Sequence, residues 1–317
     1  MSYPTIINGF LFRKDDFWDS LVLRDQDFDE THLKASVVDF MKNSNIKEIE
    51  LNDSFWSGVM DLDFLKEISW IESIRLLKYG GINYQSLKIL KNLKKIVNNY
   101  SREPIDFSSF VKLKSADILW TKGRESLLQC KSLESLTLHK YSGKNLLDFD
   151  NFQNLKHLDI TSSLIETLDG IEKLKNLEIV EIYYNSKIYN LSPLARCNTL
   201  KKIKLSNLSK ITNLNFLENC QNLVFISVSN CKNIIENVPL FKCESLRVIG
   251  YYNSGSIATI KGIEHLKNLE RFNIGNTNIE DGNLEPLLRL EKITSISFKD
   301  KKHYNLRLEE VKSKLHT

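Results

Sequence analysis

The chain has 317 residues, of which 42% are hydrophobic, and it contains only 12 Gly and 5 Pro. This composition excludes a disordered or fibrous protein and allows a sizeable apolar core. The formal net charge of +4 comes from 44 basic and 40 acidic residues, which are interleaved along the chain. Because no basic cluster stands out, the charge does not indicate nucleic acid as a partner.

The amino-terminal residues do not resemble a secretion signal. The stretch MSYPTIINGFLFRKDDFW lacks a basic start, a long apolar core and a small-residue cleavage site. No apolar stretch reaches the roughly 18 residues that a membrane-spanning helix needs. We therefore expect a soluble, cytoplasmic protein with no membrane partner.

Residues 1–45 do not follow the pattern of the rest of the chain and are predicted to form an amino-terminal cap. Four apolar residues recur there at helical spacing after acidic residues that suit a helix start: Leu33, Val37, Phe40 and Met41. We expect this helix and the apolar stretch from Ile6 to Phe12 to pack on the first repeat, because a repeat array needs its ends covered.

From residue 46 to residue 299 one pattern recurs, with apolar residues at its first, fourth and sixth positions. Twelve copies begin at Ile46, Ile71, Leu93, Leu113, Leu133, Leu155, Leu177, Leu200, Leu223, Leu246, Leu269 and Ile293. Successive copies are 20 to 25 residues apart and stay in phase. Such self-similarity is typical of a solenoid, in which each unit buries its apolar side against its neighbours.

The cleanest copy, LKHLDITSSLIETLDGIEKLKN, begins at Leu155. It resembles the short repeat of about 22 residues of the leucine-rich-repeat superfamily, as found in internalin-like proteins. The resemblance covers residues 46–299. It implies an α/β repeat solenoid, a curved ladder of about 12 parallel strands with short 3₁₀-like convex returns and terminal caps.

The residues within a copy support this interpretation. Leu158 and Ile160 alternate with Asp159, which predicts a strand with one buried and one open face. The remainder of the copy is short and has apolar residues every third position, as at Ile165 and Leu168. This spacing favours a tight 3₁₀-like return over a full α-helix.

The ninth position of a repeat in this family often carries Asn, whose amide bonds to the backbone of the turn. Asn185 fits this role, and other copies have side chains there with some capacity for hydrogen bonds: Ser101, Thr121, Ser163, Cys231, Ser254 and Thr277. The copies at Ile71, Leu93 and Leu113 depart from the pattern. Tyr79 stands at one ninth position, and Ala116 replaces a large apolar residue.

Residues 300–317 are predicted to form a carboxy-terminal cap. Leu308, Val311 and Leu315 are three and four residues apart, which predicts a short closing helix.

The five cysteines do not indicate a metal or redox site. Four of them lie three residues before the first leucine of the next copy, where other copies have large apolar residues: Cys130, Cys197, Cys220 and Cys243. The sequence contains no Cys-x-x-Cys motif. We expect buried, reduced thiols, which agree with a reducing compartment, and no metal or cofactor.

The group that most resembles a catalytic site is Ser135, His157 and Asp159. Ser135 and His157 occupy the same position of their copies on neighbouring predicted strands, and Asp159 lies two residues after His157. Residues two apart on a strand stand roughly parallel at about 7 Å, however, so Asp159 would not support the imidazole of His157 from behind. We interpret His139 and His157 as polar contact residues. Because metalloprotease, P-loop and dinucleotide motifs are also missing, we expect no catalytic residues.

The third, fifth and seventh positions of each copy are predicted to face the open, concave side. In copies one to six they are mainly polar, as at Glu48, Glu50, Asn52, Ser73, Arg75, Asp117 and His139, with Leu77, Val97 and Leu119 as exceptions. Copies seven to eleven carry apolar residues there, flanked by charged ones: Ile179, Tyr183, Phe225, Val248 and Tyr252, with Glu181, Lys202, Lys204 and Arg271 beside them. Apolar anchors on a wet face are typical of a protein-binding patch, although single exposed apolar residues are common.

The sequence therefore predicts a non-catalytic solenoid, monomeric when unbound, that binds another protein through its concave face. Two roles stay open, an inhibitor or immunity-type protein that blocks its partner and an intracellular scaffold or adaptor. The alternative is a secreted or surface recognition protein of the internalin-like type, which would require a secretion route.

Overall fold

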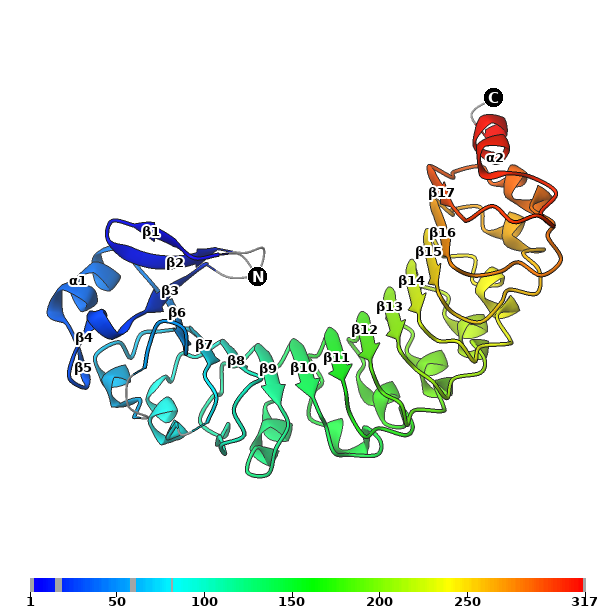
Figure 1. Ribbon diagram of the computed structural model, residues 1–317. Coiled ribbons are helices and arrows are strands. Elements are labelled where there is room, and N and C mark those ends of the chain that lie inside the picture. The colour runs from blue at the N-terminus through cyan, green and yellow to red at the C-terminus, as the bar shows by residue number, and fades with distance from the viewer. Residues whose placement is uncertain (1–2, 15–18, 58–60, 81, 316–317) are drawn as a thin grey trace. The chain divides into compact units, whose positions relative to one another are not determined.

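The computed structural model describes residues 3–14, 19–57, 61–80 and 82–315. The chain forms two compact units, Met1–Lys140 and Tyr141–Thr317. In each unit the parallel strands lie on one side and the 3₁₀ turns on the other (Figure 1).

The first unit contains one α-helix and a sheet that begins with two antiparallel pairings. Its elements are β1 (Thr5–Ile7), β2 (Phe10–Lys14), β3 (Asp19–Leu23), η1 (Asp25–Asp27), β4 (Phe28–Asp29), β5 (His32–Leu33), α1 (Ala35–Asn43), β6 (Glu48–Asn52), η2 (Asp63–Lys66), β7 (Ser73–Leu77), η3 (Tyr84–Ile89), β8 (Lys95–Asn98), β9 (Ser115–Leu119), η4 (Glu125–Gln129) and β10 (Ser135–His139). The sheet order is β1-β2-β3-β6-β7-β8-β9-β10. From β3 onward, adjacent strands of this unit are parallel.

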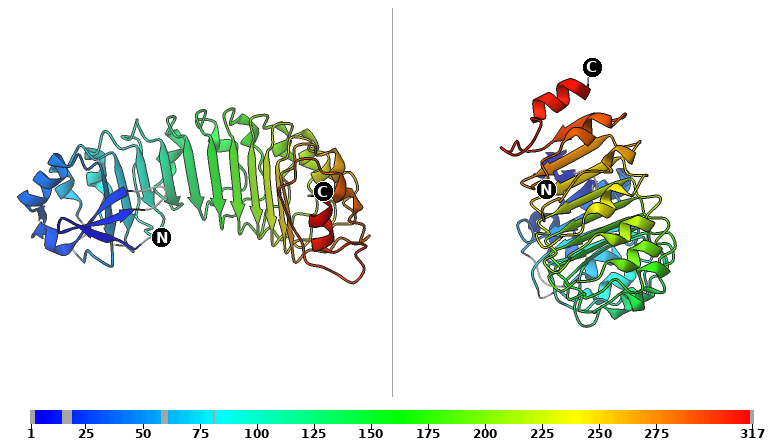
Figure 2. Two further views of the ribbon diagram at one scale, coloured as in Figure 1. Left: turned by 90° about the horizontal axis from the view of Figure 1, so that it is seen from above. Right: turned by 90° about the vertical axis from the view of Figure 1, so that its right-hand side faces the viewer.

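The second unit alternates strands and 3₁₀ turns until it ends in a helix. Its elements are η5 (Leu147–Phe149), β11 (His157–Thr161), η6 (Ile171–Lys173), β12 (Ile179–Tyr183), η7 (Ser192–Arg196), β13 (Lys202–Ser206), η8 (Asn215–Asn219), β14 (Phe225–Ser229), η9 (Val238–Phe241), β15 (Val248–Tyr252), η10 (Ile263–His265), β16 (Arg271–Gly275), η11 (Glu285–Arg289), β17 (Ser295–Ser297) and α2 (Leu308–Leu315). Neighbouring strands are parallel, and Figure 2 shows them side by side from green to orange. These strands and returns confirm the predicted repeat ladder.

Alternating burial explains why each copy forms a strand. Leu158 and Ile160 of β11 are buried, whereas Asp159 between them is partly exposed. The next apolar residues of the copy, including Ile165 and Leu168, are fully buried beneath the sheet. Full burial of a side chain of this size stabilises the fold by about 1.5–3 kcal/mol before entropy costs. The repeated apolar positions therefore form the core.

Each of the strands β11 to β16 is followed by a left-handed residue, the eighth position of its copy. The φ angle there is positive at Ser162, Tyr184, Asn207, Asn230, Asn253 and Asn276, and it lies between 47° and 57°. Asn tolerates this conformation better than most residues do. This preference explains the Asn at the end of four successive strands.

The ninth-position side chains make the expected hydrogen bonds to the backbone. Asn185 donates to the carbonyls of Ile160 and Tyr183, both at 2.8 Å, and accepts from the Ser163 amide at 2.7 Å. The hydroxyl of Ser254 accepts in the same way from the amide of Cys231, at 3.1 Å. These bonds satisfy buried backbone groups at the point where the chain turns.

In the early copies, a different side chain makes the hydrogen bonds that the ninth-position residue makes elsewhere. Tyr79 is 72% exposed and does not enter the core. The guanidinium of Arg124 is buried instead, and its nitrogens donate at 2.8–3.1 Å to oxygens of Asn98, Ser101, Glu103 and Leu119. Burial lowers the pKa of Arg124 to about 10, so the side chain remains charged near neutral pH. One arginine thus satisfies the carbonyls of an irregular loop.

The amino-terminal segment differs in part from the expectation. Helix α1 lies where the helical spacing predicts it, with Val37 and Met41 buried. Of the apolar stretch, Leu11 and Phe12 are buried, but Ile6 is 69% exposed because it lies on the hairpin strand β1, at the outer edge of the sheet. Strand β3, which the sequence pattern did not reveal, pairs in parallel with β6.

At the other end, α2 lies within the segment predicted to be helical, and its Val311 is buried. The boundaries of the two caps, 1–45 and 300–317, stay predictions.

We predict that Arg124→Met strongly destabilises the protein. The substitution leaves several buried carbonyls without donors, at a cost of about 1–3 kcal/mol for each group that water cannot reach. We expect the free energy of unfolding in urea to fall by at least about 3 kcal/mol. Arg102→Met, at an exposed residue of the same loop, is the control and should change little. Equal stability of the two variants would show that Arg124 does not hold the loop.

Candidate functional site

The predicted binding residues lie on the outward-facing side of strands β12 to β16, which we name the β12–β16 face. The strand register places five of them in one row across the strands: Ile179, Lys202, Phe225, Val248 and Arg271. Lys204 lies in the next row beside Glu181, and Tyr183 and Tyr252 lie in the third row. The sequence pattern therefore brings the predicted residues together on one continuous surface of the second unit.

These side chains are not part of the core. Tyr252 is 39% exposed and Arg271 is also exposed. The remaining six are partly exposed: Ile179, Tyr183, Lys202, Lys204, Phe225 and Val248. A partner could therefore reach all of them, and their role in binding stays a prediction.

The ring of Tyr252 lies close to the backbone of two glycines, Gly250 on its own strand and Gly275 on the next strand. A Cβ atom on Gly250 would stand 2.7 Å from the ring carbon Cε2, and one on Gly275 would stand 3.0 Å from Cδ1. Real Cβ atoms essentially never make the first of these contacts, and the second is tighter than most Cβ contacts are. The two glycines thus make room for an aromatic ring that is held against the face before any partner arrives.

A carboxylate holds the polar side chains of β12 and β13 in place. Glu181 receives a hydrogen bond from the hydroxyl of Tyr183 at 2.8 Å, and the Nζ atoms of Lys204 and Lys202 lie 3.0 and 3.5 Å from it. Its side chain is only 12% exposed. Burial raises the pKa of the Glu181 carboxyl, but hydrogen bonds from Lys204 and Tyr183 outweigh this effect and hold the pKa below its ordinary value.

The ammonium group of Lys202 also contacts the neighbouring aromatic ring. Its Nζ atom lies 5.5 Å from the centroid of the Phe225 ring, a distance suited to a cation–π interaction. Lys202 therefore connects the polar part of the face to its apolar part.

The equivalent face of the first unit is open only in part. Glu48, Asn52, Asp117 and His139 are partly exposed, as expected, but Glu50, Ser73 and Arg75 are buried. Arg13 of the β1–β2 hairpin (Figure 1) donates two hydrogen bonds to the carboxylate of Glu50, at 2.8 and 3.0 Å, and Arg75 donates another at 3.3 Å. The expectation was wrong here because the hairpin strand β2 brings a charged partner onto the face.

The two histidines considered from the sequence, His139 and His157, make no arrangement typical of a catalytic site with the residues that the structure describes. His139 lies 2.8 Å from Asp117, and Asp159 accepts a hydrogen bond from Thr161 at 2.8 Å. Burial lowers the pKa of His157, and its Nε2 atom has no hydrogen-bond partner among the residues that the structure describes. Within the same residues there is no group of His, Cys, Asp or Glu that could hold a metal ion.

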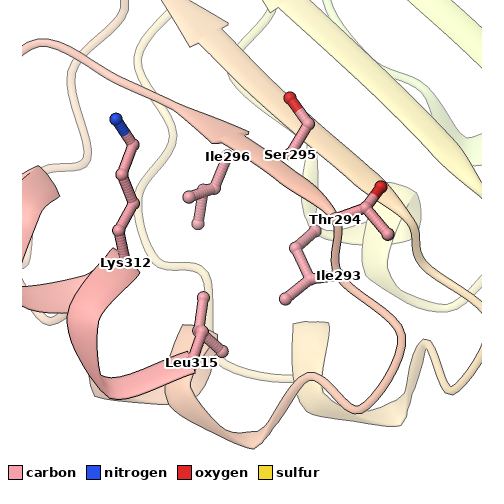
Figure 3. Close-up of a pocket in the computed structure, with 6 residues that line it drawn as sticks. All are labelled: Ile293, Thr294, Ser295, Ile296, Lys312 and Leu315. Atoms are coloured by element: carbon pink, nitrogen blue, oxygen red, sulfur yellow. The ribbon is translucent and has the colours of Figure 1, made fainter. Parts of the chain in front are cut away.

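Two hollows lie outside the β12–β16 face. The hollow between β17 and α2, lined by Ile293, Ile296, Lys312 and Leu315 among others, has a volume of about 250 Å³ (Figure 3). This is below the range of about 300–1,000 Å³ that small-molecule sites usually have.

The second hollow, of about 420 Å³, lies beside the 3₁₀ turns and is lined in part by Cys220 and Cys243. Burial raises the pKa of the Cys220 thiol to about 12 and also raises that of Cys243. A thiol that stays protonated is a poor nucleophile and a poor metal ligand. All five cysteines are free and buried, which confirms the expectation of buried thiols.

No helix in the described ranges is both long enough and apolar enough to cross a membrane.

The sequence pattern did not reveal the role of the two glycines or the contact of Arg13 in the hairpin with Glu50. A glycine in a strand often marks the close approach of another group, so Gly250 and Gly275 were a usable signal. No comparable signal linked Arg13 to Glu50, because a pairing of residues 37 positions apart leaves no local pattern.

We predict that Glu181 contributes stability that disappears in acid. Because the folded state lowers the pKa of this carboxyl, the contribution is present above its ordinary pKa and is lost as the pH falls below about 4. Glu181→Gln should therefore lower the free energy of unfolding at neutral pH, and the difference from the wild type should shrink on acidification. Urea titrations across this pH range measure it. Glu178→Gln, which removes an exposed ion pair with Lys201, is the control, and a difference that does not depend on pH would contradict the prediction.

Comparison with known proteins adds to this description. No protein-family model matches the chain. Human leucine-rich repeat-containing protein 36 is 38% identical over 86 residues, which make up 26% of this chain and 11% of that protein. The chain thus matches only a small part of the length of this curated relative.

Solved structures are similar to this chain in fold, although their sequences differ from it. An internalin from Listeria monocytogenes has a TM-score of 0.59 at 16% identity, and the likeness covers 80% of this chain and 81% of that one. TLR13, solved in complex with ssRNA13, also has a TM-score of 0.59 at 14% identity, over 85% of this chain and 45% of that one. At such identities the likeness shows the fold. Together with the twelve in-phase repeats and their parallel strands, it shows that this chain has the leucine-rich-repeat fold.

Proposed function

We propose that this protein is a non-catalytic binding module that holds another protein on its β12–β16 face. One observation carries the proposal, namely a partly exposed apolar and aromatic cluster on a sheet face that is otherwise polar. Phe225, Val248 and Tyr252 form its centre. Contiguous apolar side chains of this kind supply most of the binding energy at protein interfaces.

The cluster needs little rearrangement to receive a partner. Tyr252 already lies against the two glycines, and Phe225 already contacts Lys202. The parallel strands beneath fix the backbone on which these side chains stand. Binding therefore avoids much of the ordering cost that flexible loops or side chains incur.

Within this class we propose the role of an inhibitor or immunity-type protein that covers and blocks its partner. A rigid face without catalytic groups suits blocking, and a scaffold or adaptor is the second role that the same face supports. We also propose a cytoplasmic location and a monomer in the unbound state. The five free, buried thiols support the location, because reduced cysteines persist in a reducing compartment. The internalin-like fold favours the alternative of a secreted or surface recognition protein.

We predict that replacing both Phe225 and Tyr252 by Ala abolishes partner binding without unfolding the protein. Removing two anchors from the centre of an interface should weaken binding by at least about tenfold. The melting temperature should change by no more than about 4 °C, because both side chains lie outside the core. Capture from the native cell with quantitative mass spectrometry, followed by calorimetry with the captured protein, measures the loss.

The matched control removes two exposed apolar side chains elsewhere in the same unit. Tyr189 and Ile235 are 58% and 73% exposed, and they lie outside the strands of the face. Their double Ala variant should retain every captured protein. Equal capture by both double variants would reject the β12–β16 face, and a collapse in stability of the first variant would show that its residues belong to the core.

A further inference from the structure

The outward-facing charge of strands β13 to β17 has a single sign. At the outward-facing positions of these strands the charged residues are Lys202, Lys204 and Arg271, and no Asp or Glu stands among them. The other positions carry Ser, Gly, Asn or the apolar residues already described. A partner that approaches this part of the face therefore meets a positive surface.

The acidic group at the margin of this surface does not cancel its charge. Glu181 of β12 is largely buried and already interacts with Lys202, Lys204 and the hydroxyl of Tyr183. The side chains of both lysines are 34% exposed. Arg271 is exposed. Two separate cationic sites thus remain open to a ligand, at β13 and at β16.

The strand register places an apolar pair between these two cationic sites. Lys202 lies beside Phe225, Phe225 beside Val248, and Val248 beside Arg271. Four adjacent strands about 4.8 Å apart make the distance from the first to the last of them about 14 Å. The row therefore reads basic, apolar, apolar, basic at a fixed spacing.

We propose that this row recognises an extended acidic segment of a partner protein, with the pattern acid, any residue, apolar, any residue, acid. In an extended chain, alternate residues point to the same side, and four steps of about 3.3 Å cover about 13 Å. Two carboxylates at the ends would reach Lys202 and Arg271, and the apolar residue between them would rest on Phe225 and Val248. This inference rests on the proposed function and specifies the chemistry of the partner.

The apolar centre favours a peptide over a single-stranded nucleic acid. Nucleic acids bind by stacking their bases on open aromatic faces along a strongly basic groove. Here the ammonium group of Lys202 lies over the Phe225 ring, and the aliphatic Val248 stands next to it. Only three cations serve the whole surface. An aliphatic or aromatic side chain between two carboxylates fits these groups better than a phosphate backbone does.

The test uses the full chain and short peptides with blocked ends. The probe is Ac-Ser-Asp-Ser-Leu-Ser-Asp-Ser-NH₂, in which the two Asp residues and the Leu point to one side. Its isomer, Ac-Ser-Ser-Asp-Leu-Asp-Ser-Ser-NH₂, has the same composition but directs the acids away from the side that carries the Leu. A third peptide replaces Asp by Lys in the probe, and a 12-nucleotide oligouridylate represents nucleic acid. Dissociation constants are measured by NMR titration at low ionic strength.

We expect the probe to bind at least about fivefold more tightly than its isomer and than the Lys peptide. Replacing both Lys202 and Arg271 by Gln should weaken binding of the probe by at least about tenfold. The control variant replaces Lys210 and Arg289 by Gln. These two exposed residues lie outside the strands, so this variant makes the same change in net charge and should bind the probe as the wild type does.

Four results would overturn the inference. The first three are equal binding of the probe and its isomer, equal binding of the acidic and basic peptides, and absence of probe binding at millimolar concentration. The fourth is tighter binding of the oligouridylate, which would favour a nucleic acid partner. If any of these occurs while Phe225→Ala with Tyr252→Ala still loses a captured protein, the face binds protein and only the acidic pattern is wrong.

Discussion

The structure depends on one constraint, namely that the apolar residues of a single repeat cannot be buried by that repeat alone. Leu158 and Ile160 become inaccessible only because equivalent residues of the adjoining copy, such as Val180 and Ile182, pack beside them. This coupling keeps the strands in register. It also determines the opposite face, because every side chain between two buried positions must point outward. The arrangement of Lys202, Phe225 and Val248 in one row is therefore a consequence of core packing.

Backbone groups impose a second constraint, since each copy turns twice within a buried interior. Regular copies satisfy it with a short polar side chain at the ninth position, as Asn185 does. The irregular loop near residue 100 satisfies it with the guanidinium of Arg124, which supplies many donors from a single side chain. The second solution carries a net charge and has a larger desolvation cost. It occurs within the two shortest copies, which begin at Leu93 and Leu113 and are each 20 residues long.

Periodicity made much of the fold predictable, and departures from it account for what was not. The strands, the 3₁₀ returns and the buried thiols follow from apolar positions that recur at fixed spacing, so twelve noisy copies together give a clear pattern. The same register placed all the candidate site residues on one surface. Strand β3 and the pairing of Arg13 with Glu50 occur once each and join distant segments, so they left no repeated trace. Arg124 was likewise unpredictable, because its role exists only where the pattern fails.

The two units use the same sheet geometry for opposite purposes. In the first, the outward position of β6 carries Glu50, and Arg13 of the hairpin donates two hydrogen bonds to it. This buried ion pair holds two segments of the chain together. In the second, Glu181 organises Lys202 and Lys204 from within, which leaves their ammonium groups partly accessible. The carboxylate of Glu181 fixes the positions of the two lysine side chains, so the surface is positively charged and rigid. Recognition on such a surface would be selective through spacing, because the strands fix where each cation stands.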